Sequence, residues 1–253
     1  MNGRRRYGFA VTTPLALLRR TLRSPGNRGA LSGRSAILLL ALSLTPGASE
    51  GASAAPVTTA GAAVELHLLQ PDGSPAAEAV LAAYPLETKS FPAPSPAVMD
   101  QRDRRFEPRV LPVQTGARVT FPNSDTVSHH VYSFSTAKRF QLFLGKGEPA
   151  QTQTFGRSGV VTLGCNLHDW MLGYIVVLDT PYFAVTDGAG RARVTGLPPG
   201  TYRLEVWHAR FSDATSRPTR EVRVEAGASE TWELKLDRPL LPARDQKPGF
   251  VEY

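Results

Sequence analysis

Cysteine is almost absent from this chain of 253 residues: it occurs once, at Cys165, so no disulfide can form within the chain. Long stretches rich in Leu, Lys and Glu, the composition typical of helical bundles, are also missing. Glycine, at 22 residues, and proline, at 21, are instead frequent. This composition predicts many short strands joined by turns, and the length allows one large domain or two small ones.

Excess charge is missing from most of the chain, although its formal net charge is +7. Residues 1–54 hold eight arginines and a single acidic residue, Glu50. The remainder carries 21 basic side chains, which is 29 less eight, and 21 acidic ones, which is 22 less one. A neutral body offers no electrostatic surface to a polyphosphate, so we expect no nucleic-acid partner.

Long apolar runs are absent as well. The strongest, Ser35–Leu44, has about ten apolar residues, whereas a helix needs about 20 to span a bilayer. It follows an arginine-rich stretch and precedes the small-residue pattern Ala52-Ser53-Ala54, an order typical of a secretory signal peptide over residues 1–54. We therefore expect cleavage near Ala54-Ala55 and a periplasmic or otherwise exported protein with no stable membrane span in the mature chain. An uncleaved membrane-anchoring segment is the alternative.

Turn signals recur about every eight to twelve residues after the leader, which is the spacing typical of β-sandwiches. In the middle of the chain, the predicted strands are 97–99, 106–113, 118–121, 129–134, 140–144, 160–165 and 173–178. On either side of them, the predicted strands are 64–69, 79–84, 183–186, 192–197, 202–207, 220–224 and 231–236. No helix of ten or more residues is expected, so the predicted fold class is all-β.

Donor atoms for a soft metal ion lie close together in the segment Cys165–Met171, between two predicted strands. Its thiolate, the imidazole of His168 and the thioether of Met171, joined by one more histidine, make up the ligand set of a type 1 copper site. Calcium and magnesium prefer oxygen ligands. Zinc remains an alternative, although structural zinc sites generally use two or more cysteines. A lone thiol in an oxidising compartment favours an occupied site over an inert buried cysteine.

A further histidine follows Phe121-Pro122-Asn123, in the segment His129-His130-Val131. With these residues, the region 97–180 resembles the cupredoxins, the blue copper proteins. Phe106-Glu107-Pro108, Gly116 and Val119–Asn123 are similar to the opening motif of that family, F-x-P…G-x-x-V-x-F-x-N. The spacing Cys165-x-x-His168-x-x-Met171 is similar to the short ligand loop of amicyanin.

The same stretch also resembles exported bacterial proteins labelled methylamine utilization proteins, a label that does not establish a methylamine pathway. The resemblance implies a Greek-key β-sandwich over residues 96–180 that holds one type 1 copper ion. The ligands implied are His129, Cys165, His168 and Met171.

Two adjacent histidines leave the first ligand open, because the family segment reads H-N-V where this chain has His129-His130-Val131. Successive strand residues point to opposite faces, so only one of the two can face the metal. Aligning Val131 with the valine of the family makes His129 the ligand. His130 is the alternative, since a slip of one residue reverses every side chain. Asn123 and His130 are the candidates for hydrogen bonds that hold the ligands in place.

Enzymatic functions have less support. Five histidines are too few for a trinuclear copper cluster, which excludes a multicopper oxidase. A nucleophilic pair of Cys165 and His168 would leave Met171 without a role, and no third residue to orient the pair is apparent. His67 and His208 are predicted to be surface or packing residues. We expect a protein that is not an enzyme.

The flanking segments carry a second resemblance. Val64–Leu69, Asp72-Gly73 and Ala79–Leu81 look like the first hairpin of the carboxypeptidase regulatory-like sandwich, and Thr186–Gly190 with Leu197–Leu204 look like its later strands. Neither half has enough strands to bury two faces alone.

We therefore predict a second, small Ig/transthyretin-like β-sandwich that is discontinuous, built from residues 62–88 and 181–238. The cupredoxin would be inserted into it, and residues 239–253 would form a flexible tail. The alternative is that the N-terminal strands extend the cupredoxin sheet.

The expected function is that of a periplasmic carrier of single electrons. By resemblance, the ring edge of His168 would face solvent as the electron exit, and Leu167, Trp170 and Leu172 would form the docking surface. The partner would be a redox protein such as a cytochrome c or a dehydrogenase, in a small transient encounter. Because ligands alone do not specify turnover, a copper-binding, copper-buffering or interaction module without electron transfer is the alternative.

Overall fold

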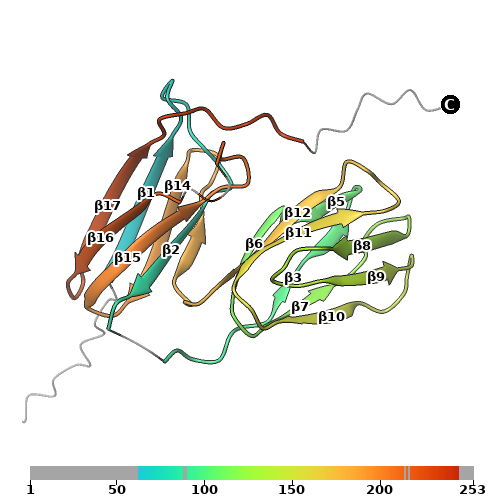
Figure 1. The fold of residues 1–253 in the computed structure, drawn as a ribbon. Helices are drawn as coiled ribbons and strands as arrows, with labels where there is room; N and C mark the ends of the chain where they lie inside the picture. Colours follow the sequence, from blue (N-terminus) through green and yellow to red (C-terminus); the bar gives the residue numbers. More distant parts are fainter. Residues whose placement is uncertain (1–61, 88–89, 214, 216, 245–253) are drawn as a thin grey trace, which may run out of the picture. The chain divides into compact units, whose positions relative to one another are not determined.

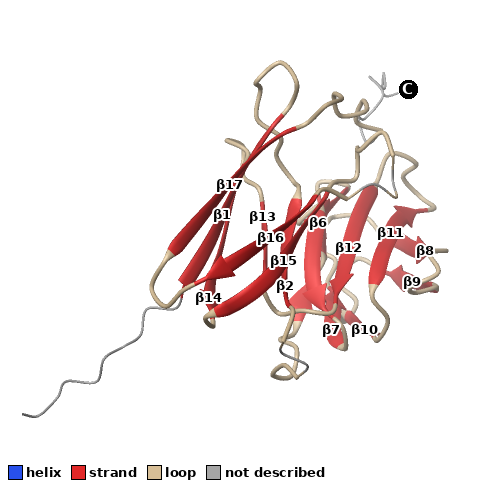
Figure 2. Cartoon of the chain, turned by 60° about the vertical axis from the view of Figure 1, so that its left-hand side comes forward, coloured by secondary structure: helices blue, strands red, loops and turns tan. Residues whose placement is uncertain are grey.

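Strands arranged in two β-sandwiches, without any helix, make up the described part of the computed structural model: residues 62–87, 90–213, 215 and 217–244 (Figure 1, Figure 2). The all-β prediction is confirmed. All described residues belong to one compact unit, residues 54–253. The predicted signal peptide, residues 1–54, lies outside the described residues. Within the described part, no helix has the length and apolar character needed to cross a membrane.

The middle of the chain forms a cupredoxin-like sandwich of two sheets. The larger sheet has the order β6 (Val110–Gln114), β12 (Leu172–Leu178), β11 (Gly159–Cys165), β8 (His129–Ser133) and β9 (Phe140–Leu144). The smaller sheet has the order β10 (Gln151–Phe155), β7 (Ala117–Phe121) and β3 (Ala97–Val98). A separate hairpin joins β4 (Asp100–Arg102) to β5 (Arg105–Glu107).

The core of this sandwich forms because apolar residues alternate along the strands, so each strand turns one set of side chains inward. Buried examples are Val119 and Phe121 on β7, opposite Val161 and Leu163 on β11. Cys165 and Met171 belong to the same apolar cluster. The candidate metal-binding sulfur atoms therefore lie at the end of the core rather than on the surface.

The second sandwich combines strands from both ends of the described chain. One sheet has the order β14 (Arg191–Leu197), β1 (Ala62–Leu69) and β17 (Ser229–Lys235). The other has the order β13 (Phe183–Val185), β2 (Val80–Pro85), β15 (Gly200–Trp207) and β16 (Thr219–Val224). Both β1 and β2 pair with strands that follow residue 182, which supports the proposal of a discontinuous sandwich with the cupredoxin-like one inserted.

A third apolar cluster lies where the outer face of β6 and β12 packs against β2 and β15 (Figure 2). Its buried members are Val80, Ala82, Val110, Val176, Leu178 and Trp207. The rings of Tyr174 and Trp207 meet edge to face, with centroids 5.6 Å apart. Arg109, which precedes β6, forms an ion pair with Glu78 of the second sandwich. The β6–β12 part of the outer face is therefore covered by protein.

Three local features differ from the predictions. The single strand expected over residues 106–113 is divided into β5 and β6, because Pro108 has no N–H to donate to a continuous ladder. The strands β4 and β10 were not predicted. In the region expected to be a tail, Leu240 is buried against the second sandwich, and the N–H of Leu241 donates to the carbonyl of Arg210.

Candidate metal centre

The candidate ligands come from the ends of two neighbouring strands and the loop between β11 and β12. His129 is the first residue of β8, and Cys165 is the last residue of β11. Antiparallel pairing places Cys165 opposite Val131, so both residues lie at the same end of the sheet. The N–H of Asn166 donates to the carbonyl of His130, which holds the start of the loop against β8. His168 then follows on this loop.

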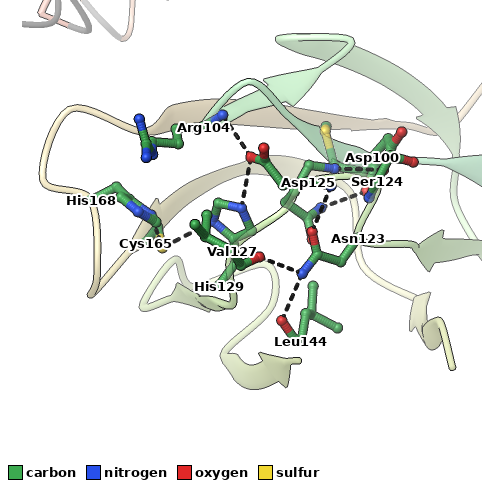
Figure 3. A network of polar contacts seen from close by, with 12 residues as sticks. Asp100, Arg104, Asn123, Ser124, Asp125, Val127, His129, Leu144, Cys165 and His168 are labelled. Carbon is green, nitrogen blue, oxygen red and sulfur yellow. Dashed lines mark hydrogen bonds and ion pairs between the residues drawn. The ribbon is translucent and has the colours of Figure 1, made fainter. Parts of the chain in front are cut away.

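Three donor atoms converge at this end of the sandwich (Figure 3). The Sγ atom of Cys165 lies 3.7 Å from Nδ1 of His129 and 3.6 Å from Nδ1 of His168. All three donor atoms lie within 4.8 Å of one another. His129 is fully buried, Cys165 is buried and His168 is half-buried.

These separations fit a shared metal ion. Metal–sulfur bonds of about 2.3 Å and metal–nitrogen bonds of about 2.0 Å, opened by about 110–120°, separate the two donor atoms by about 3.5–3.7 Å. Both observed sulfur–nitrogen distances, 3.7 and 3.6 Å, agree with that separation. One thiolate with two imidazoles suits copper better than a structural zinc ion, which usually has more cysteines.

Asp125 holds the ring of His129 from the side opposite the cysteine. Its Oδ2 atom lies 3.0 Å from Nε2 of His129 and also accepts the backbone N–H of Arg104, at 2.7 Å (Figure 3). A carboxylate can only accept hydrogen bonds, so Nε2 carries the ring proton. Nδ1 faces Sγ of Cys165, and once its own proton is released its lone pair is free to bind a metal ion there.

The protonation states of the cluster also favour metal binding. Burial raises the pKa of Cys165, but hydrogen bonds from His129 and the backbone of His130 and Leu167 outweigh it and leave the pKa below its ordinary value. For His168, burial and the nearby positive charges of His129 and Arg104 lower the pKa. A thiol that ionises easily beside a neutral imidazole is ready to bind a cation.

The pKa of His129 shifts in the other direction. Burial alone lowers it, yet the hydrogen bonds with Cys165 and Asp125 together raise the pKa above its ordinary value. Burial raises the pKa of Asp125, but its bonds with Arg104 and His129 leave it lowered. A proton at His129 between thiolate and carboxylate occupies the position that a metal cation would take over, so binding would release it.

Asn123 stabilises the segment that leads into β8. Its Nδ2 donates to the carbonyls of Val127 and Leu144, each at 2.9 Å, and its Oδ1 accepts the N–H of Asp125 at 3.0 Å (Figure 3). Leu144 on β9 lies directly opposite His129 in the sheet register. Asn123 thus fixes both the carboxylate and the strand start that position the first histidine.

His130 lies outside the donor cluster, as strand alternation requires once His129 points inward. Its Nδ1 accepts a hydrogen bond of 3.1 Å from the side chain of Asn166 on the outer face of the sheet. Figure 3 shows the ring of His129 between Cys165 and Asp125.

Met171 and the expected docking residues surround His168 in different ways. Met171 is buried in the core cluster, and its backbone N–H donates to the carbonyl of His168. The ring of Trp170 lies 5.6 Å from that of His168, between centroids. Leu167 is 53% exposed, whereas Trp170 and Leu172 are half-buried. Leu167 and Trp170 thus place apolar surface beside the half-buried histidine.

Asp125 and Arg104 are site residues that the sequence analysis missed. Asp125 stands four residues before His129 in a polar loop, and this spacing was the available signal. Arg104 follows Asp103 in the turn between β4 and β5, where both residues have positive φ angles of 54° and 52°. Because β4 and β5 were not predicted as a hairpin, nothing in the sequence brought Arg104 to the ligands.

Comparison with solved structures finds copper proteins that align with part of the chain. An amicyanin variant in its oxidised state is 28% identical, with 32% of this chain and 80% of that one aligned and a TM-score of 0.29. A purple cupredoxin from Nitrosopumilus maritimus is 23% identical over 32% of this chain and 99% of its own, with a TM-score of 0.28.

A copper-containing nitrite reductase from Thermus scotoductus SA-01 is 24% identical over 45% of this chain and 28% of its own, with a TM-score of 0.32. No family model matches the chain. No curated protein matches it either. At TM-scores near 0.3 these likenesses carry no functional argument, and the donor cluster itself is the basis for the function proposed below.

Proposed function

We propose that this protein binds one type 1 copper ion and carries single electrons between redox partners in the periplasm. The convergence of Sγ of Cys165 with the Nδ1 atoms of His129 and His168, at 3.7 and 3.6 Å, is the observation that supports it most strongly. Met171 would supply a thioether as the fourth donor, which completes the donor set typical of blue copper sites.

The protein residues would hold the site ready for either oxidation state. Copper bound there would supply a one-electron couple, Cu(I)/Cu(II). His129 is fixed by Asp125 and buried in the sandwich, and Cys165 is fixed at the end of a paired strand. Ligands held by a rigid scaffold need little rearrangement when the charge changes, which suits a carrier rather than an enzyme.

The half-buried ring of His168 would provide the route for the electron to the surface. Leu167 and Trp170 beside it offer apolar surface for a small, transient contact with a cytochrome c, a dehydrogenase or another redox protein. The leader-like sequence over residues 1–54 supports an exported location.

A visible absorption spectrum recorded during Cu(II) addition tests the copper assignment. We expect an intense thiolate-to-copper charge-transfer band that saturates at one ion per chain. Cys165→Ser should lose the band, and His129→Ala should lose the site, whereas His130→Ala should keep both, because His130 lies on the other face. A Cys165→Ser protein that keeps the charge-transfer band would contradict the assignment of Cys165 as the thiolate ligand of a type 1 copper site.

Voltammetry of the copper-loaded protein separates an electron carrier from a copper buffer. We expect a fast, reversible one-electron couple and rapid electron exchange with a small cytochrome c. A colourless protein that still binds metal would point to zinc or buffering. Slow electron transfer with ready copper loss would also contradict the carrier function.

A further inference from the structure

The turn between β4 and β5 brings an arginine to the edge of the metal centre. Arg102 pairs with Arg105 in the hairpin register, so Asp103 and Arg104 are the two residues of the turn. Both have positive φ angles, of 52° and 54°. Two-residue turns with this backbone favour glycine at the second position, because glycine adopts a positive φ without strain. An arginine there is strained, and strain of this kind points to a use for the side chain.

The backbone of Arg104 is fixed to the carboxylate that orients the first ligand. Its N–H donates to Oδ2 of Asp125 at 2.7 Å, and the same oxygen lies 3.0 Å from Nε2 of His129. This hydrogen bond holds the strained turn at the ligand end of the cupredoxin-like sandwich. The side chain of Arg104 takes no part in it, so a substitution of the side chain leaves the hydrogen bond in place.

The guanidinium of Arg104 is directed toward His168 (Figure 3). After burial and the charge of His129, the charge of Arg104 is the next cause that lowers the pKa of His168, so the two side chains lie within electrostatic range. Arg102 forms an ion pair with Asp100, whereas the half-buried Arg104 has no ion-pair partner among the described residues. Its positive charge is therefore available to a molecule that approaches the ring of His168.

The neighbouring residues add a second positive charge. Arg105 is exposed and, like Arg104, has no ion-pair partner in the part of the chain that the structure describes. The segment Arg102–Arg105 holds three arginines against one carboxylate, that of Asp103. Asp169, the acidic residue of the ligand loop, lines a groove beside the outer face of β8 instead. The β4–β5 side of the ligand loop is thus positively charged.

We propose that Arg104 makes the surface at His168 a docking point for an acidic redox protein, one that presents carboxylates to the arginine and an apolar residue to Leu167. The side chain of Leu167 is 53% exposed beside the histidine and supplies the apolar contact. Complementary charges across an interface raise the association rate and select the partner, more than they raise affinity. The electron-transfer part of this inference rests on the proposed function, whereas the anion-binding surface depends on the fold alone.

Anion binding by the metal-free protein tests the surface without copper. The probe is hexacyanocobaltate(III), a trianion that is inert to oxidation and reduction, and NMR follows the amide resonances of Arg104 and Leu167. We expect Arg104→Gln to weaken binding several-fold and Arg104→Lys, which keeps the charge, to retain most of it. Arg157→Gln is the matched control and should bind like the parent. Arg157 is exposed two residues before β11, and β11 carries Cys165 at its other end.

Electron transfer to oxidants of opposite charge tests the docking role. Stopped-flow absorbance measures the oxidation of the Cu(I) protein by hexacyanoferrate(III), an anion, and by tris(phenanthroline)cobalt(III), a cation; each takes up one electron. We expect Arg104→Gln to lower the ratio of the anion rate to the cation rate several-fold, and Arg157→Gln to leave it unchanged. A change in driving force moves both rates in the same direction, so the ratio isolates the charge. The rate with hexacyanoferrate(III) should also fall as ionic strength rises.

The two measurements separate a failure of this inference from a failure of the proposed function. If Arg104→Gln bound hexacyanocobaltate(III) as tightly as the parent, or kept the parent ratio of rates, the docking surface would be overturned. A protein that binds the anion through Arg104 but develops no charge-transfer band with Cu(II) would support the anion-binding surface and overturn the proposed function instead.

Discussion

At the scale of single residues, the site depends on a carboxylate that would not itself touch a metal. Asp125 accepts the N–H of Arg104 and binds Nε2 of His129, so one side chain links the β4–β5 turn to the first ligand. It orients the ring, fixes its tautomer and places a negative charge behind the imidazole. Loss of that charge should therefore affect both metal affinity and reduction potential.

We expect Asp125→Asn to weaken copper binding by about 10–100-fold, the usual cost of removing a partner that orients a ligand. The reduction potential should rise, because removal of a nearby negative charge favours the less positive Cu(I) form. Competition titration with a chelator measures the affinity, and voltammetry measures the potential. Asp103→Asn, in the exposed turn beside Arg104, is the control and should change neither strongly. Parent-like values for Asp125→Asn would contradict the role assigned to this carboxylate.

At the scale of elements, strand β12 leaves the ligand loop through a position that admits only glycine. A Cβ atom at Gly173 would lie 2.9 Å from Cβ, Cγ and Cδ2 of Phe106. Phe106 is buried on β5, and its Cβ cannot move without the backbone. The contact between β12 and the β4–β5 hairpin is therefore packed too closely for any side chain.

We expect Gly173→Ala to reduce the free energy of unfolding by about 1–3 kcal/mol, the usual cost of overpacking a core. Gly164→Ala should cost less, because the atoms it would meet are the far end of the half-buried Tyr132 ring. Gly156→Ala has no heavy atom within 4 Å of its new Cβ and serves as the control. Urea unfolding of the three variants measures the order, and a Gly173→Ala protein as stable as Gly156→Ala would refute this account of the hairpin contact.

The two sheets of the cupredoxin-like sandwich contain strands that a sequence pattern can predict and one that it cannot. Strands with apolar alternation, such as β7 and β11, were predictable because one face of each is buried. The strand β10 reads Gln-Thr-Gln-Thr-Phe and has no such pattern. It forms because the edge of β7, 30 residues or more away in the sequence, offers hydrogen-bond partners to this segment. Its strand conformation therefore depends on pairing with β7 and not on a pattern within its own sequence.

The same distinction applies to the candidate site. The loop spacing of Cys165, His168 and Met171 is local and could be read directly, and the structure brings Cys165, His168 and His129 into one cluster. The contribution of Asp125 depends on where the Arg104 turn lies in space, which the pattern of residues 100–107 did not predict. The candidate ligands could thus be predicted from the sequence, whereas Asp125 and Arg104, which orient the first histidine, could not.

At the scale of the whole molecule, a buried histidine lies beside the contact between the sandwiches. His208 follows the interface residue Trp207 and is 3% exposed. Its Nε2–H donates to the carbonyl of Ala77, and its Nδ1 accepts the N–H of Arg210. Only the neutral ring satisfies both bonds, because protonation would place a second N–H against that of Arg210. Burial is the main cause that lowers the pKa of His208 to about 4.

The stability of the metal-free protein should therefore depend on pH in a defined direction. Above pH 6.5, the ring is neutral in both the folded and the unfolded chain, and its full contribution is present. As the pH falls from 6.5 toward 4, only the unfolded chain gains the proton, so the free energy of unfolding falls by up to about 3 kcal/mol. His208→Gln keeps a donor for Ala77 but cannot titrate, so it should remove this part of the slope. Urea unfolding of both proteins at several pH values measures the difference. If the free energy of unfolding changed with pH equally in the two proteins, His208 would not contribute to the pH dependence of stability.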